Sequence, residues 1–184
     1  MRRATILHGT DGTPEINWLP WLALELQSRG YEVFAPLLPE NHTPNRLVYD
    51  AFLGEQKWDY SDNLLVGHSS GATTAINLLS SSDWFPRVKR TILVGTFLNE
   101  DLLDEASWYE KGQFDHLFQD SVDMEKMKDR CKDIIFVHGD NDPYCSFEDA
   151  SKFCSELKGK MVTVKNGLHL SSNRIELEEI IPYI

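Results

Sequence analysis

Short apolar runs alternate with longer amphipathic stretches along almost the whole chain, and this alternation restricts the fold more than any other feature. The apolar runs are typical of buried strands and occupy residues 4–8, 31–35, 63–67, 91–95, 133–138 and 160–165. The other stretches repeat apolar residues at helical spacing, over residues 17–29, 47–56, 70–81, 147–157 and 174–182. Because parallel neighbours require crossover helices, we expect an α/β protein with a doubly wound sheet of about six parallel strands and helices on both faces.

Nothing in the sequence divides the chain. Repeats, low-complexity tracts and linkers rich in Pro, Gly and Ser are absent from its 184 residues, so we expect residues 1–184 to form one domain. Asn17 is the expected N-cap of the first helix. The polar stretch from 99 to 131 lacks strand-like runs and predicts two or three short helices.

The charge balance restricts the partners. The chain has 29 acidic and 18 basic residues, a formal net charge of −11. This charge disfavours nucleic acid and anionic membrane surfaces, because both attract clustered Lys and Arg. No apolar run reaches membrane-spanning length, and the short apolar stretch near Met1 does not resemble a secretory signal. The three cysteines lack metal-ligand spacing and are expected to be reduced thiols, which predicts a cytoplasmic protein.

A pentapeptide at the end of the third apolar run carries the clearest chemical signal. Gly67-His68-Ser69-Ser70-Gly71 matches G-x-S-x-G at a predicted strand-to-helix junction. The two glycines leave room for the strand and the helix to cross, and the turn exposes the serine hydroxyl. Ser69 is therefore the candidate nucleophile, with the Ser70 backbone N–H as a donor to an oxyanion. The alternative interpretation is a glycine-rich turn whose serine only caps the helix.

A serine nucleophile requires an acid and a base, which follow in that order along the chain in this kind of fold. The apolar run at 134–137 ends in a turn with two aspartates. Asp142 stands immediately before Pro143, which rigidifies the turn. Asp140 is the competitor, although aspartates in turns usually accept backbone N–H groups. We favour Asp142 as the acid.

His169 is the candidate base, because it follows the last strand and a glycine turn and comes last in the expected order. His8 and His138 close strands and are expected to make structural hydrogen bonds. His68 is held inside the serine turn, and the remaining histidines, His42 and His116, lie in loops.

The second oxyanion donor is expected from the glycine-rich turn after the first strand, where the Thr10 backbone N–H is the best candidate. A thiol mechanism using Cys145 is the less favoured enzyme class. Sequence order gives Cys145 no adjacent base, and a buried apolar position is its expected fate.

Together these motifs resemble the compact serine hydrolases of the retinoblastoma-binding protein 9 and YdeN type. The resemblance is carried by LHG at 7–9, NWLPWL at 17–22, GHSSG at 67–71, GQFDH at 112–116, HGDNDP at 138–143 and GLH at 167–169. It implies a minimal α/β-hydrolase fold without two leading antiparallel strands, a strand order of 2-1-3-4-5-6, and catalytic roles for Ser69, Asp142 and His169. The chain departs from the pattern at Leu168, where glycine is commoner, and at Asp11, whose carboxylate would oppose an oxyanion if it pointed inward.

The expected activity is acyl transfer to water. Ser69 would attack a carboxylic ester, thioester or amide of a small substrate and form an acyl-enzyme, with no cofactor and no metal. The segment at about 97–131 is interpreted as a helical cap, and Trp108, Phe114 and Trp18 are candidate pocket residues. The alternative function is a protein-binding module that keeps the hydrolase scaffold and recognises a protein partner with little or no catalysis.

Overall fold

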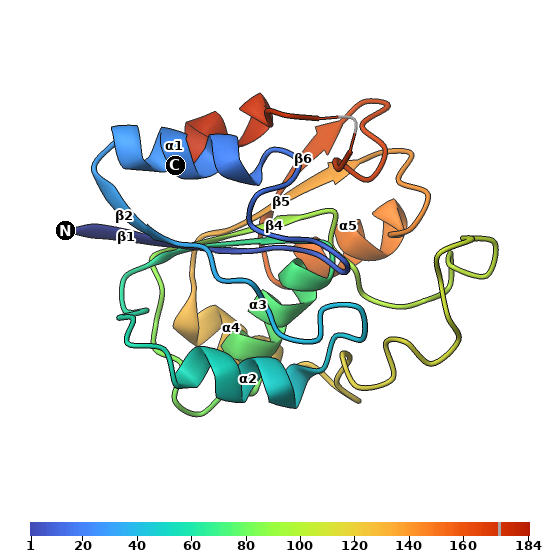
Figure 1. Cartoon of the computed structure of the whole chain (residues 1–184), viewed down its shortest axis with the longest axis horizontal. Coiled ribbons are helices and arrows are strands. Elements are labelled where there is room, and N and C mark those ends of the chain that lie inside the picture. Colours follow the sequence, from blue (N-terminus) through green and yellow to red (C-terminus); the bar gives the residue numbers. More distant parts are fainter. Residues whose placement is uncertain (173) are drawn as a thin grey trace.

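The computed structural model describes residues 1–172 and 174–184 and contains one six-stranded sheet (Figure 1). The strand order is β2-β1-β3-β4-β5-β6, as the family resemblance implied, and every neighbouring pair is parallel. The strands are β1 Arg2–Leu7, β2 Tyr31–Phe34, β3 Leu64–His68, β4 Arg90–Val94, β5 Ile134–Gly139 and β6 Lys160–Val164.

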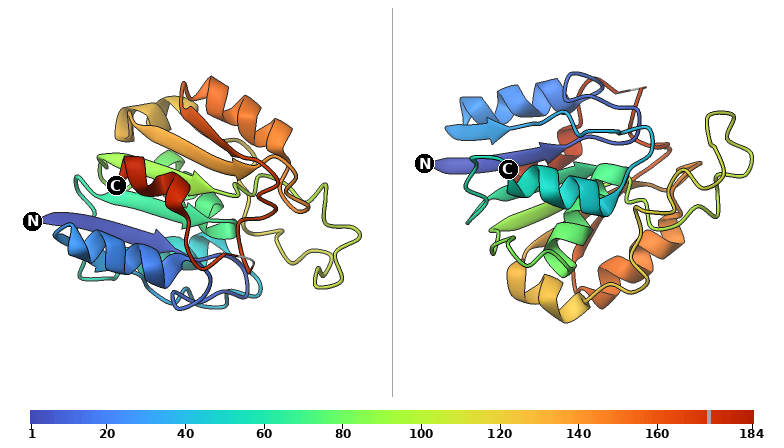
Figure 2. Two further views of the ribbon diagram at one scale, coloured as in Figure 1. Left: turned by 90° about the horizontal axis from the view of Figure 1, so that it is seen from above. Right: turned by 60° about the horizontal axis from the view of Figure 1, so that its bottom comes forward.

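Helices cover both faces of this sheet, as Figure 2 shows from two further directions. One face carries α1 Leu19–Ser28 and the C-terminal 3₁₀ helix η1 Glu178–Tyr183. The opposite face carries α2 Arg46–Gly54, α3 Ser70–Ser80, α4 Met124–Arg130 and α5 Phe147–Glu156. This arrangement confirms the predicted doubly wound α/β architecture.

An apolar core lies between each face of the sheet and the helices that cover it. Successive strand residues point to opposite faces, so Leu65 of β3 packs toward α3 whereas its neighbour Val66 packs toward α1. Every residue of β3 and β5 is buried, which explains why these runs are continuously apolar and not alternating.

The N-cap of the first helix is not the residue that the sequence predicted. Asn17 was the expected N-cap, but its φ of 55° is left-handed, and Trp18 occupies the N-cap without a side-chain cap hydrogen bond. Pro20 stands in the first turn, where its missing N–H costs nothing. The C-terminal helix is likewise shorter than the predicted 174–182, since only Glu178–Tyr183 forms a 3₁₀ helix.

The segment from 97 to 131 is not the helical cap that the sequence predicted. Within the described residues it forms one helix, α4, which packs on α3. Residues 97–123 form a chain of turns and bends that projects beyond the carboxyl ends of the strands (Figure 1). Of the helices in the described part of the chain, none is both long and apolar enough to cross a membrane.

The sheet has its topological switch between β1 and β3. The chain leaves β1 toward β2 through α1 on one face, and it later leaves β3 through α3 on the other face. Loops after such neighbouring strands diverge and leave a crevice at the carboxyl edge, where ligands bind in open parallel sheets. The residues after β1 and after β3 are those around Thr10 and Ser69.

Candidate active site

Ser69 occupies a strained turn between β3 and α3. Its φ of 56° and ψ of −124° lie in a region that residues other than glycine rarely adopt. Ser69 is the N-cap residue of α3, yet its side chain makes no capping hydrogen bond. The capping interpretation is therefore wrong, and the hydroxyl is left for the cavity that it lines.

The two glycines of the pentapeptide permit close backbone packing. A Cβ at Gly67 would lie well under 3.0 Å from the Gly71 carbonyl, and a Cβ at Gly71 would clash equally with the Leu7 carbonyl. Glycine is therefore required at both positions for α3 to start directly against β3 and the end of β1.

Asp142 lies in the turn after β5 and is buried. Its Oδ2 accepts a 2.8 Å hydrogen bond from His169 Nδ1, and its Oδ1 accepts the backbone N–H groups of Tyr144 and Cys145. Burial by itself would raise the pKa of Asp142, but the hydrogen bond and charge of His169 with the two N–H donors hold that pKa below its usual value. The carboxylate is therefore ionised at neutral pH.

Asp140, the alternative candidate for the acid, makes a different hydrogen bond. Its Oδ1 accepts the N–H of Asn166, and Asn141 Oδ1 accepts the N–H of Leu168. These two side chains fasten the turn after β5 to the loop that carries His169. Asp140 therefore acts as a turn aspartate of the ordinary kind.

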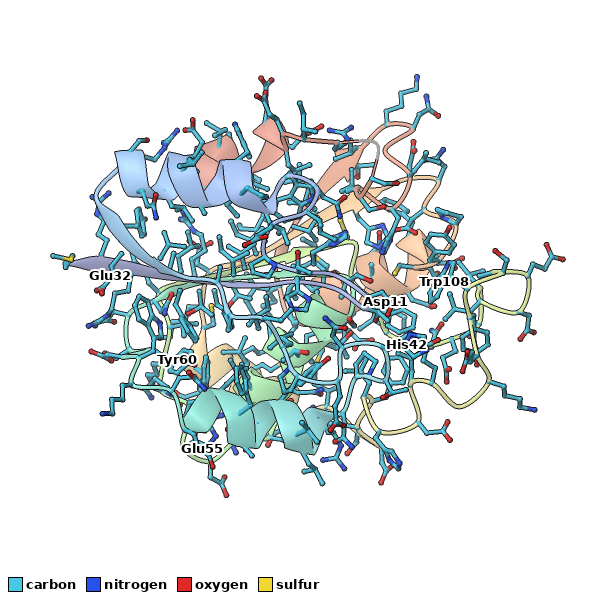
Figure 3. All side chains as sticks on the ribbon, in the orientation of Figure 1. Asp11, Glu32, His42, Glu55, Tyr60 and Trp108 are labelled. Carbon is cyan, nitrogen blue, oxygen red and sulfur yellow. The ribbon has the colours of Figure 1, made fainter. Side chains whose placement is uncertain are left out.

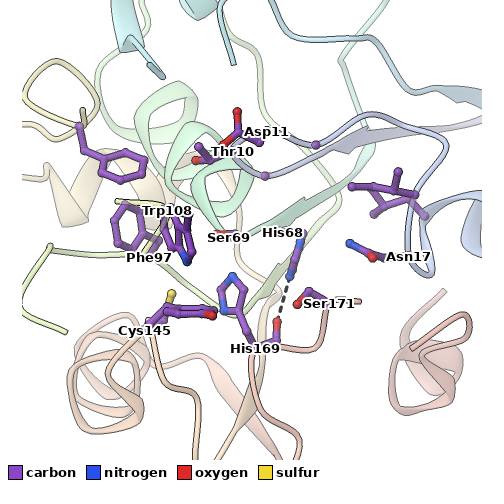
Figure 4. A pocket seen from close by; sticks show the side chains of 16 residues that line it. Thr10, Asp11, Asn17, His68, Ser69, Phe97, Trp108, Cys145, His169 and Ser171 are labelled. Carbon is purple, nitrogen blue, oxygen red and sulfur yellow. Dashed lines mark hydrogen bonds between the residues drawn. The ribbon is translucent and has the colours of Figure 1, made fainter. Parts of the chain in front are cut away.

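The contact with Asp142 fixes the proton on His169. An ionised carboxylate only accepts hydrogen bonds, so Nδ1 carries the proton and Nε2 is the free basic nitrogen. His169 and Ser69 line the same cavity (Figure 4), although no hydrogen bond joins the two side chains within the described part of the chain.

The loop that carries His169 is held in an unfavourable conformation. Leu168 and Leu170 both have φ above 50°, which costs about 1–2 kcal/mol per residue. His68 Nε2 lies 3.0 Å from the carbonyl of His169, and Trp18 Nε1 donates a 2.7 Å hydrogen bond to the carbonyl of Leu170. These contacts hold the loop in place, and Figure 4 shows the one between His68 and His169.

Sequence reasoning missed both of these supporting roles. His68 was assigned to the serine turn alone, and Trp18 was a candidate pocket residue. Trp18 is instead fully buried in the core under α1 and is not among the residues that line the cavity. The NWLPWL block carried the family resemblance, but it did not predict the contact of Trp18 with a loop about 150 residues further along the chain.

A cavity of about 310 Å³ opens above Ser69 and His169. Trp108 and Phe114 line it, at two of the positions proposed from the sequence. They belong to a run of edge-to-face aromatic contacts that passes through Tyr144, whose ring lies 5.3 Å from the ring of His169. Figure 4 shows the cavity, whose other lining residues are Gly9, Thr10, Asp11, Gly12, Ile16, Asn17, Leu19, His68, Phe97, Cys145 and Ser171.

Asp11 lies at the rim of this cavity, at the end of the molecule where Figure 3 also labels His42 and Trp108. Its Oδ1 is 2.9 Å from His42 Nδ1, so the carboxylate is engaged by the imidazole. The hydrogen bond and the charge of Asp11 raise the pKa of His42. When His42 is protonated, its positive charge offsets the negative charge of Asp11 near the predicted oxyanion donors.

Cys145 is closer to the acid and the base than sequence order suggested. Its sulfur, an Asp142 carboxylate oxygen and a His169 ring nitrogen all lie within 4.8 Å of one another. Burial, followed by the charge of Asp142, raises the pKa of the Cys145 thiol well above its usual value, which disfavours the nucleophilic thiolate. Cysteine, aspartate and histidine can bind metals, but here the carboxylate and imidazole already bond each other.

The parallel sheet with a strained serine turn at the carboxyl edge of its third strand defines the class of protein, an α/β-hydrolase. The chain belongs to the serine hydrolase family, whose model matches residues 4–175.

Solved structures share the fold at low sequence identity. The YdeN gene product of B. subtilis is 18% identical with a TM-score of 0.86, over 99% of this chain and 96% of that one. Est1E of Butyrivibrio proteoclasticus with bound ferulic acid is 17% identical with a TM-score of 0.71, over 98% and 86%. An esterase of Pyrococcus furiosus is 14% identical with a TM-score of 0.65, over 98% and 76%.

Proposed function

We propose that this protein hydrolyses small carboxylic esters, thioesters or amides through an acyl-enzyme on Ser69. One observation carries the proposal: the strained Ser69 lines the same cavity as His169, whose ring is hydrogen-bonded to the buried Asp142 carboxylate. Esterases among the structural neighbours support the same reaction class.

The first half of the reaction transfers one proton and forms one bond. His169 Nε2 takes the Ser69 proton while Oγ attacks the substrate carbonyl carbon, and buried Asp142 stabilises the resulting imidazolium. The tetrahedral intermediate then collapses, and the leaving group departs with the proton from His169. The contact between serine and histidine tightens only with substrate bound in many such enzymes.

The second half repeats these steps with water. His169 takes a proton from water as the water oxygen attacks the acyl carbon, and Ser69 leaves as the alcohol. In both halves the backbone N–H groups of Thr10 and Ser70 stabilise the oxyanion. Ser70 is the first residue of α3, so its N–H has no partner inside the helix.

The cavity favours small acyl groups. Its volume of about 310 Å³ is at the lower end of the range for small-molecule sites, and aromatic rings form one wall. The buried thiols of Cys131, Cys145 and Cys154 are free, which agrees with a protein of the reducing cytoplasm.

Steady-state hydrolysis of p-nitrophenyl acetate tests the assignment of the acid. We expect Asp142→Asn to lower kcat by about 10³-fold or more, because the amide cannot stabilise the imidazolium or hold the correct tautomer. Asp140→Asn is the matched control, and kcat should stay within about tenfold of the parent because an amide oxygen still accepts the Asn166 N–H.

The reverse order of effects would transfer the catalytic role to Asp140. A folded parent protein without any hydrolysis of p-nitrophenyl acetate or of the corresponding thioester and anilide would instead favour the binding-module alternative.

A further inference from the structure

The two proposed oxyanion donors come from segments that are far apart in the sequence. Thr10 follows β1, and Ser70 starts α3 after β3. Both N–H groups must point at one oxygen, at about 3 Å, for the oxyanion to be stabilised. The relative position of the two segments therefore matters for the rate of the chemical step.

Backbone pairing joins β1 to β3 as far as Leu7 and Gly67, and close packing brings together the two segments that follow these strands. A Cβ at Gly9 would lie 2.9 Å from the Cβ of Ser69, and a Cβ at Gly71 would overlap the Leu7 carbonyl. Van der Waals contact of this kind limits approach but does not prevent the loop from sliding along the helix end.

A pair of hydroxyl groups links the two segments beyond the ends of the strands. Thr10 Oγ1 donates a hydrogen bond of 2.9 Å to Ser70 Oγ. Ser70 is buried and Thr10 is half-buried, so water competes only weakly for this bond. The bond joins the same two residues whose backbone N–H groups are the proposed donors, and Figure 4 shows Thr10 beside Ser69 at the cavity.

Separate hydrogen bonds hold the residues on either side of Thr10. His8 Nδ1 lies 2.8 Å from the Gly9 carbonyl, and the Asp11 N–H donates to the Asn41 carbonyl. Thr10 thus lies between two anchored residues, and its own side chain faces α3. In α3, the carbonyl of Ser70 accepts a hydrogen bond from the Thr74 hydroxyl, which fixes the partner residue as well.

We propose that the hydrogen bond between the Thr10 and Ser70 hydroxyls is a clamp that sets the distance between the two oxyanion N–H donors. Thr10 and Ser70 thus each have a positioning role through the side chain, in addition to the backbone role in the proposed function, on which this inference rests. Loss of the clamp should slow the chemical step and leave substrate binding almost unchanged, because the oxyanion exists only beyond the ground state.

A double-mutant cycle with p-nitrophenyl acetate tests the clamp. Thr10→Val removes the hydroxyl at constant shape, and Ser70→Ala removes its partner. Each should lower kcat about tenfold or more, with KM within about twofold. The double variant should be no slower than the slower single variant, because both substitutions break the same bond. Thr10→Ser should restore most of the kcat lost in Thr10→Val.

Other outcomes contradict the clamp in distinct ways. Unchanged kcat with a lowered melting temperature would make the bond purely structural. A slow Thr10→Val beside a Ser70→Ala of parental kcat would make the Thr10 hydroxyl itself an oxyanion donor. If kcat of the double variant falls by the product of the two single-variant losses, the two hydroxyls act independently. A folded parent that neither hydrolyses p-nitrophenyl acetate nor reacts with a fluorophosphonate probe would overturn the proposed function together with the clamp.

Discussion

His68 is a buried, neutral imidazole whose ring lies 5.0 Å from the ring of His169. Burial, followed by the charge of neighbouring His169, lowers the pKa of His68 to about 3. The carbonyl of His169 can only accept a hydrogen bond, so His68 Nε2 carries its single proton. Its neutrality therefore keeps one N–H directed at the loop that carries His169 across the physiological pH range.

This lowered pKa predicts how stability depends on pH. Unfolding returns the pKa of His68 to about 6.5, so the unfolded chain binds more protons below that value. Stability is therefore fully present above pH 6.5 and is lost as the pH falls toward 3. Between pH 7.5 and 5.5, His68 should lower the free energy of unfolding by about 1.4 kcal/mol.

Urea unfolding of His68→Gln measures this contribution, because glutamine keeps an N–H donor and does not titrate. The pH-dependent loss should be smaller in the variant than in the parent by about 1.4 kcal/mol. His116→Gln is the matched control at an exposed position. Equal pH dependence in the parent and in His68→Gln would show that His68 is not buried as a neutral ring.

The sequence supported those residue assignments that depend on the geometry of a local turn. The pentapeptide around Ser69 encodes its own strained geometry, since Gly67 and Gly71 are required within the same few residues. The supporting contacts of His68, Trp18 and Cys145 depend instead on how three separate loops pack. No local pattern reports such packing, so these contacts were missed.

At the scale of elements, β1 and α3 meet in a very close backbone junction beside the site. The start of α3 lies against the carbonyls of Leu7 and His8, and every residue from Ser70 to Ser80 is buried. Helix α3 therefore cannot move away from β1 without loss of core packing.

Alanine substitution tests this junction. Gly71→Ala should cost at least about 3 kcal/mol of the free energy of unfolding, because its Cβ meets backbone carbonyls that cannot rotate away. Gly30→Ala is the matched control. Gly30 has a φ of 81° and no atom within 4 Å of an added Cβ, so the cost is backbone strain alone, about 1–2 kcal/mol. Urea unfolding at pH 7.5 that ranks the two variants equally would contradict this packing.

The elements with strong periodicity were predictable, and those without it were not. The six strands follow from apolar runs, whereas their order came from the family resemblance. The segment 97–123 lacks helical spacing and is fixed from outside, for example by Asn77 Nδ2 donating to the Leu117 carbonyl. Asn17 failed as a cap because the turn requires a left-handed residue there, which asparagine tolerates.

At the scale of the whole molecule, the site arises from one edge of the sheet. The loops after β1, β3, β5 and β6 supply Thr10, Ser69, Asp142 and His169 in that order. Parallel strands bring all four carboxyl ends to one side, so residues 159 positions apart reach one cavity. We therefore expect this edge of the sheet to make Ser69 a working nucleophile.

Labelling with a fluorophosphonate probe, followed by mass spectrometry of the adduct, tests that claim most directly. Ser69→Ala, His169→Ala and Asp140→Asn are compared with the parent, each after its fold is verified. We expect a single adduct on Ser69, absent in Ser69→Ala, formed at least about 100-fold more slowly in His169→Ala and at a rate close to parental in Asp140→Asn. A folded parent that remains unlabelled, or an adduct on another residue, would contradict it.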